Sequence, residues 1–258
     1  MKVVTGISLG AAFELACARR VWESESDPAS DLAERWTASS PLASEVFHRL
    51  DGAPPRQPVA LYSAPRFEVA RIARREDLTS LGGYELQKRF RRSLTANEFP
   101  DKLALALTKI FAEMADNVAQ HSTTVEGVPA LGLWGYHVEP RWMSFAVADT
   151  GRGILRSLRS APQYIDLRDA SEALDAAVRH HASRRVATDP GHQGSFSTLE
   201  KRLAELNGVL RFRSDDARVM LDGRKGHYET TFASSARLPG FQMVATCALD
   251  LSQGERPL

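Results

Sequence analysis

A carboxylate and a carboxamide stand four positions apart in the most regular part of the chain, where Glu113 precedes Asn117 in residues 113–121, EMADNVAQH. At about 100° per residue, a helix brings Glu113, Asn117 and Gln120 within about 60° of one another, beside an apolar stripe. A carboxylate in this position can act as a general base, and an amide oxygen is a hard ligand that suits Mg²⁺. The alternative is a solvated helix face, because such spacing is common on surface helices.

A second carboxylate follows an apolar run and opens a glycine turn. Asp149 comes directly after residues 145–148, FAVA, and begins residues 149–154, DTGRGI. A carboxylate at the end of a strand in an apolar pocket can accept a hydrogen bond from an amino group of a bound ligand. Gly151 and Gly153 allow positive φ and close approach of the backbone to a nucleotide. The competing interpretation is a tight turn that leaves a strand.

A glycine-rich turn opens the third candidate segment, residues 191–198, GHQGSFST, which lead into a predicted helix over residues 195–207. The exposed N–H groups and the helix dipole at such a helix start attract phosphate oxygens. The alternative is a plain helix cap with a glycine turn. The residues that would approach the phosphates are Gly191, Gly194, Ser195 and Thr198.

Periodicity predicts the elements that must position these residues. Apolar residues at helical spacing predict a helix over residues 101–121, in addition to the one over 195–207. Strands are predicted over residues 131–138, 142–149, 209–214, 227–238 and 241–251, the last as an edge strand. Helices interleaved with hairpin-connected strands favour an α+β fold, a two-layer sandwich with helices on one face of a mixed, mostly antiparallel sheet.

Residues 1–95 carry weaker signals, and no chemistry can be assigned to them. A helical pattern covers residues 11–22, and short strands are predicted over residues 59–62 and 67–72. We expect this region to be either an extension of the main domain or a small input module.

The main domain is predicted to cover residues 96–240, followed by a C-terminal strand and tail over residues 241–258. Within it, residues 150–194 form a long polar segment with one helix expected near residues 170–182. A segment of this length inside a compact domain is usually functional or mobile.

Composition excludes several function classes. The 258 residues, 43% of them hydrophobic, suffice for a full core in one large domain or in one domain plus an appendage. Because 33 Lys and Arg balance 32 Asp and Glu, for a net charge of +1, neither nucleic acid nor an anionic membrane is expected as a partner. Cys17 and Cys247 fit no metal pattern and are expected to be buried free thiols. The sequence contains no apolar run that approaches the ~20 residues needed to span a bilayer, and it has no signal-peptide pattern. Together with free, reduced thiols, these features predict a cytoplasmic protein.

Taken in order, the three segments resemble the nucleotide-binding boxes of the GHKL superfamily, which includes gyrase, MutL and the histidine kinases. Residues 113–121 resemble the N box, residues 149–154 the G1 box and residues 191–198 the G2 box. Residues 229–232, ETTF, followed by a Leu-Pro pair, resemble the strand and ending that close many histidine-kinase catalytic domains. The resemblance covers roughly residues 95–240.

This resemblance implies a Bergerat-type ATP-binding fold with ATP and Mg²⁺ as cofactors and residues 154–190 as a lid. It implies that Asn117 is the metal ligand and Asp149 the adenine contact, with Glu113 as the catalytic base. The G2 segment departs from the kinase form, because Ser195 and Phe196 replace alternating glycines. The other nucleotide contacts implied are Gly151, Gly153, Gly191, Gly194, Ser195, Thr198 and Thr231.

Together these features favour a Mg-ATP-binding signalling protein that hydrolyses ATP or phosphorylates a partner protein, either a phosphoacceptor or a regulator. His48 is the single histidine before the N box, and it lacks the acidic neighbour and paired helices of a phosphoacceptor. A stand-alone domain similar to anti-sigma-factor serine kinases or detached sensor-kinase catalytic domains is therefore expected, with a homodimer left open. The alternatives are a non-catalytic, nucleotide-gated interaction module and a relic that binds no nucleotide.

Overall fold

The computed structural model describes residues 8–22, 41–50, 64–72, 75–121, 130–179, 208–223 and 229–249, and every structural statement below concerns these residues. Helices and strands alternate along them. The helices are α1 (Leu9–Trp22), α3 (Pro41–Leu50), α4 (Arg75–Thr79), α5 (Leu81–Ala96), α6 (Asp101–His121), α7 (Gly153–Arg159) and α8 (Ala170–Arg179), with a 3-10 turn at Pro162–Tyr164. The strands are β1 (Phe67–Ile72), β2 (Gly132–Glu139), β3 (Trp142–Asp149), β4 (Val209–Asp222) and β5 (Glu229–Ala248).

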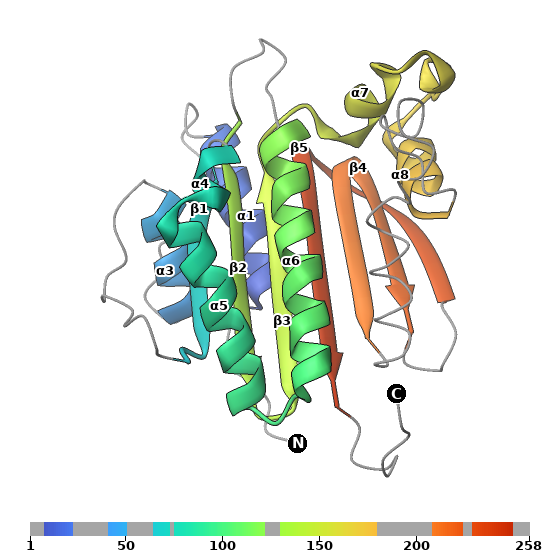
Figure 1. Cartoon of the computed structure of the whole chain (residues 1–258). Coiled ribbons are helices and arrows are strands. Elements are labelled where there is room, and N and C mark those ends of the chain that lie inside the picture. The colour runs from blue at the N-terminus through green and yellow to red at the C-terminus, as the bar shows by residue number, and fades with distance from the viewer. Residues whose placement is uncertain are drawn as a thin grey trace.

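All five strands join one antiparallel sheet in the order β1-β2-β3-β5-β4 (Figure 1). The hairpin of β2 and β3 confirms the prediction from sequence, and its turn holds Arg141 at φ 60°. The predicted helix over residues 101–121 and the predicted strand over residues 67–72 are also confirmed. The predicted strand at residues 59–62 and the helix at residues 195–207 lie outside the described residues.

Helices cover both faces of the sheet, whereas the sequence predicted helices on one face only. Figure 1 shows α5 and α6 in front of the sheet and α1 and α3 behind it. Phe145 and Val147 of β3 join the core under α6, and Ala146 and Ala148 join the core under α1. The apolar run in β3 therefore lacks the alternation of a strand with one solvated face, because both of its faces are buried.

Helix α6 lies on the sheet through an aromatic cluster. The ring of Phe111 stacks on Trp134 of β2 with centroids 4.9 Å apart, and it meets Phe90 of α5 edge-on at 5.0 Å. Phe111 and Phe90 are both fully buried. Aromatic pairs at these distances stabilise a core beyond the area that they bury. The cluster therefore fixes α6, which carries Glu113 and Asn117, against β2 and β3.

Strand β4 turns back on itself beside the end of β3. The backbone N–H of Gly223, just after β4, donates to the carbonyl of Gly208, just before it, at 2.9 Å. A straight strand of 14 residues would hold its ends about 46 Å apart, so β4 must reverse direction. The pairing with β5 is irregular between Ser214 and Ala217, where Asp215 has φ 56°. Gly240, at φ 96°, bends β5 at the same level.

The predicted edge strand over residues 241–251 is wrong. Residues 241–248 belong to β5, which pairs with β3 on one side and with β4 on the other. Met243, Ala245 and Cys247 are buried in the core under α6, which an edge strand with a solvated side would not provide. The predicted domain boundary between residues 240 and 241 thus falls inside one strand. On either side of the predicted boundary at residues 95 and 96, β1 pairs with β2 and α5 packs on α6.

Residues 153–179, the described part of the predicted lid, fold as α7, a 3-10 turn and α8. The sequence predicted a helix near residues 170–182, and α8 ends at Arg179. The buried face of α8, which includes Ala173, Leu174 and Val178, packs on β4. Arg179 pairs with Asp175 at 3.1 Å and lies over the ring of Phe232 at 5.0 Å. This part of the segment is therefore a packed helical layer.

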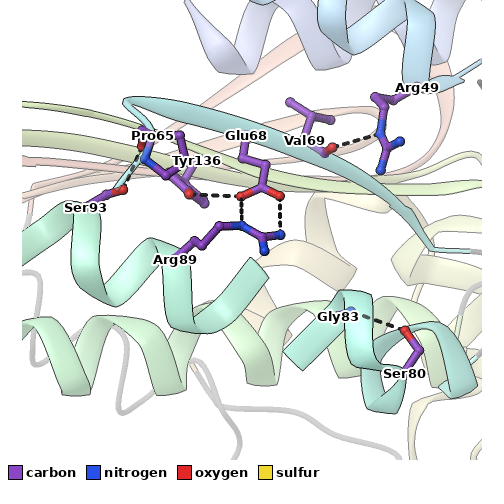
Figure 2. Close-up of polar contacts among 9 residues, drawn as sticks. All are labelled: Arg49, Pro65, Glu68, Val69, Ser80, Gly83, Arg89, Ser93 and Tyr136. Atoms are coloured by element: carbon purple, nitrogen blue, oxygen red, sulfur yellow. Dashed lines mark hydrogen bonds and ion pairs between the residues drawn. The ribbon is translucent and has the colours of Figure 1, made fainter. Parts of the chain in front are cut away.

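A buried polar cluster joins α5 to β1 (Figure 2). Arg89 donates from Nε and Nη2 to the two carboxylate oxygens of Glu68, at 2.9 and 2.6 Å. The hydroxyl of Tyr136 donates to Glu68 Oε2 at 3.1 Å, and Ser93 Oγ donates to the carbonyl of Pro65 at 2.6 Å. The Arg89 and Glu68 side chains are 10% and 12% exposed. Burial, with the nearby charge of Glu68, raises the pKa of Tyr136, so this hydroxyl remains a donor.

Cys17 and Cys247 are buried free thiols, as expected. Burial raises the pKa of both thiols to about 12, which keeps them protonated and unreactive at neutral pH. Among the described helices, none has the length and apolar character needed to cross a membrane.

Candidate functional site

Asp149 ends β3 as a buried carboxylate, with 6% of its surface exposed. Its Oδ1 accepts a hydrogen bond from the N–H of Gly151 at 2.7 Å, while the N–H of Thr150 donates to the carbonyl of Leu131 at 2.9 Å. The chain therefore leaves the strand in a tight turn, as one interpretation of the sequence expected. A carboxylate has two oxygens and about four acceptor positions, and the N–H of Gly151 occupies one of them.

The turn passes into α7 through Gly153, whose φ of 73° is left-handed. Such a conformation favours glycine, because a side chain would collide with the following backbone. Gly153 thus uses the freedom that the sequence predicted, whereas Gly151 is not among the described glycines with positive φ. The next residue, Ile154, donates its N–H to Ser214 Oγ on β4 at 2.9 Å. The glycine turn therefore starts a helix that is tied to the sheet.

Helix α1 closes the sheet beside Asp149. The negative charge of Asp149 acts together with burial, the larger cause, to raise the pKa of Cys17 on α1. Gln242 Nε2 donates to the carbonyl of Gly10 at 2.7 Å, and Arg213 Nη1 donates to Glu14 Oε1 at 2.5 Å. A small recess between these elements is lined by Glu14, Cys17, Asp149, Arg213, Leu238, Pro239, Gly240, Phe241 and Gln242. Sequence reasoning assigned no role to α1.

Asn117 lies on the flank of α6 that points away from α4 and α5. Two ion pairs mark the other flank, Asp116 with Arg75 of α4 at 3.1 Å and Asp101 with Arg91 of α5 at 2.9 Å. At 100° per residue, Asn117 stands about 100° from Asp116 and about 160° from Asp101. In Figure 1 this is the side of α6 on which β5, β4 and α8 lie. Asn117 is half-buried there.

Asn117 and Asp149 lie at the same end of the sheet. Gly132, which begins β2, pairs directly with Asp149. A Cβ on Gly132 would come within 2.7 Å of Cγ1 of Val118, the residue after Asn117, so α6 touches the sheet there. Glu113, about one helical turn earlier, is exposed. The structure thus brings two of the predicted site segments together, although 32 residues separate Asn117 from Asp149 along the chain.

Five further predicted site residues comprise four from segment 191–198, together with Thr231. Gly191, Gly194, Ser195 and Thr198 lie outside the described residues. Thr231 is exposed and pairs with Met220, on the part of β4 beyond the reversal, whereas β3 pairs with β5 from Phe241 onward. The structure therefore does not bring Thr231 to Asp149.

The side-chain oxygen of Asn117 on α6 is a hard ligand of the kind that Mg²⁺ accepts. Across the described residues there is no group of three or more His, Cys, Asp or Glu side chains that could hold a metal ion. Mg²⁺ usually keeps several waters and takes one or two protein oxygens beside substrate phosphates. A half-buried Asn117 amide fits that requirement.

No protein-family model matches this chain, and the search of curated proteins found no match. Functional inference therefore depends on the chemistry and placement of Asp149, Asn117 and Glu113. Sequence reasoning missed Ser214 and Gly240, which border the Asp149 turn. Neither belongs to a local motif. Ser214 contacts Ile154 across 60 positions of sequence, and Gly240 lies against the carbonyl oxygen of Asp149.

Proposed function

We propose that this chain is a Mg-ATP-binding signalling module with a histidine-kinase-like ATPase fold, which hydrolyses ATP or phosphorylates a partner protein. The observation that carries the proposal is a buried carboxylate, Asp149, at the end of β3, followed by a glycine turn and lying at the same end of the sheet as Asn117. An antiparallel sheet with α6 packed on β2 and β3 is compatible with a Bergerat-type arrangement. Helices α1 and α3 would be an additional layer behind it.

Asp149 supports selection of adenine. It is buried, so a ligand that reaches it must lose water, and an acceptor in such a site discriminates strongly against a partner that lacks a donor. Adenine presents an amino group in the position where guanine presents a carbonyl oxygen. A carboxylate that accepts from this amino group therefore favours ATP over GTP. Asn117 would complete the site as the single protein ligand of the nucleotide-bound Mg²⁺.

Asp149→Asn is expected to weaken Mg-ATP binding about tenfold to hundredfold, because hydrogen bonds to a charged group contribute about 1.5–3 kcal/mol. The substitution preserves the fold, since the amide oxygen of Asn can still accept from the N–H of Gly151. Isothermal titration calorimetry with ATP, and with GTP as a competitor, measures the change. Asp116→Asn removes a carboxylate from the other flank of α6 and should bind ATP within twofold of wild type. Absence of heat with the wild type, or equal affinity in Asp149→Asn, would disprove the proposal.

Glu113→Ala separates catalysis from binding. Glu113 lies on α6 within one turn of Asn117 and is exposed, so it can reach a water or a protein hydroxyl as a general base. We expect Glu113→Ala to bind Mg-ATP like the wild type and to lose about a hundredfold or more in phosphate release or phosphotransfer, since a general base contributes about 10²–10⁴-fold. If neither protein turns ATP over while both bind it, the chain is a nucleotide-gated interaction module instead. The packing of α7 and α8 on the sheet gives such a module a folded surface to present.

A further inference from the structure

One buried hydroxyl connects three segments around the Asp149 turn. Ser214, the last residue of β4 before its reversal, is 1% exposed. Its Oγ accepts from the N–H of Ile154 at 2.9 Å and donates to the carbonyl of Gly240 at 3.0 Å. A serine hydroxyl has one hydrogen to donate, so its donor and one acceptor position are both in use. The first turn of α7, the reversal in β4 and the bend in β5 thus meet at one atom.

Close backbone contacts connect Gly153, Gly240 and Asp149 around Ser214. A Cβ on Gly153 would approach Ser214 Oγ to 2.8 Å and the carbonyl oxygen of Gly240 to 3.2 Å. A Cβ on Gly240 would in turn approach the carbonyl oxygen of Asp149 to 1.9 Å. The two glycines therefore allow the turn, the β5 bend and Ser214 to pack without intervening side chains. Displacement of Ser214 would leave room for the turn to shift.

We infer that Ser214 is a positioning residue, which holds the Asp149 turn and the start of α7 in the geometry that nucleotide binding needs without touching the nucleotide. The inference rests on the proposed function of Asp149. The hydroxyl ties the first turn of α7 to β4, and it fixes the point from which residues 153–179 leave the sheet. Loss of the hydroxyl leaves the Ile154 N–H and the Gly240 carbonyl without this partner in a buried place, and the turn then samples other conformations.

Ser214→Ala tests this inference, with Ser144→Ala as its matched control. Ser144 is also a buried serine on the sheet, 4% exposed, but its Oγ accepts from Thr246 at 3.4 Å, away from the turn. Amide hydrogen exchange of Ile154 in nucleotide-free protein reports the turn, and calorimetry reports Mg-ATP affinity. In Ser214→Ala, the hydrogen-exchange rate of the Ile154 amide should rise at least about tenfold, and the affinity for Mg-ATP should fall about fivefold. Ser144→Ala should stay within twofold of wild type in both.

Ser214→Thr restores the hydroxyl and should return the Ile154 exchange rate and ATP affinity toward wild type, which a purely structural loss of packing would not predict. Melting temperatures of the two alanine variants, expected to be similar, exclude general destabilisation as the cause. Unchanged Ile154 exchange in Ser214→Ala would overturn the inference, as would equal ATP affinity of Ser214→Ala and wild type. A wild type that fails to bind ATP would instead disprove the proposed function, and with it the nucleotide part of this inference.

Discussion

Arg89→Met is expected to lower the free energy of unfolding by about 3–5 kcal/mol, because it leaves the carboxylate of Glu68 buried without its cation. The pair is bidentate, at 2.6 and 2.9 Å, and both side chains are close to 10% exposed. Figure 2 shows the carboxylate of Glu68 between Arg89 and the hydroxyl of Tyr136, which cannot replace a positive charge. Urea denaturation at neutral pH measures the change.

Two further variants define the cause. Arg91 is also on α5 and makes a bidentate contact with Asp101, but its side chain is 40% exposed and that of Asp101 is 68% exposed. Arg91→Met should therefore cost less than about 1 kcal/mol, as exposed pairs do. The double variant Glu68→Gln with Arg89→Met should recover at least half of the loss, because no charge remains buried. A loss in Arg89→Met no larger than in Arg91→Met would show that the Glu68 carboxylate is hydrated in solution.

Gly240→Ala should destabilise the protein by about 3 kcal/mol or more and also weaken Mg-ATP binding. A residue with a side chain at φ 96° is strained by about 1–3 kcal/mol, and its Cβ would lie 1.9 Å from the carbonyl oxygen of Asp149. That oxygen belongs to the backbone in the middle of a sheet, so β5 and the end of β3 must separate. The separation also displaces the turn at Asp149, so the variant loses both stability and affinity for ATP. Thermal unfolding and calorimetry on one preparation measure both effects.

Gly82→Ala is the control, with an effect of opposite sign. Gly82 lies in the first turn of α5, and a Cβ there would meet Ser80 Oγ at 3.8 Å, an ordinary contact. Alanine in a helix is favoured over glycine by about 0.5–1 kcal/mol, so this variant should be slightly more stable and should bind ATP normally. A Gly240→Ala variant as stable as Gly82→Ala would rule out the bend at residue 240.

The functional consequence of the fold is that Asp149 lies between two layers. On one side of the sheet, α6 contributes the flank with Asn117, and α1 on the other side closes the recess at Asp149 through Glu14 and Cys17. Adenine bound at Asp149 would thus sit next to a helix from the N-terminal region, to which the sequence assigned no chemistry. Helix α1 packs in the same core as β3. Nucleotide binding should therefore be tested with protein that retains α1.

Local patterns were enough to predict α6, the β2 and β3 hairpin and the turn at Asp149. In α6, buried residues such as Leu107 and Phe111 recur every three to four positions, and in the hairpin two apolar runs flank a short polar turn. The side chains of the proposed site, a carboxylate at a strand end and an amide on a helix, could also be identified from the sequence. Each of these local features depends on neighbours within a few residues.

Long-range pairing decided the rest. Whether residues 241–248 lie at an edge or inside the sheet depends on contacts with both β3 and β4, and nothing in their own sequence specifies two partners. The contact of α3 with β1, the Glu68 and Arg89 pair and the Ser214 contacts all join residues at least 20 positions apart. A sequence determines which faces are apolar and must be covered. Because apolar burial is not directional, it does not specify the element that covers each face. Only the folded chain determines which element covers each face, and therefore what surrounds Asp149.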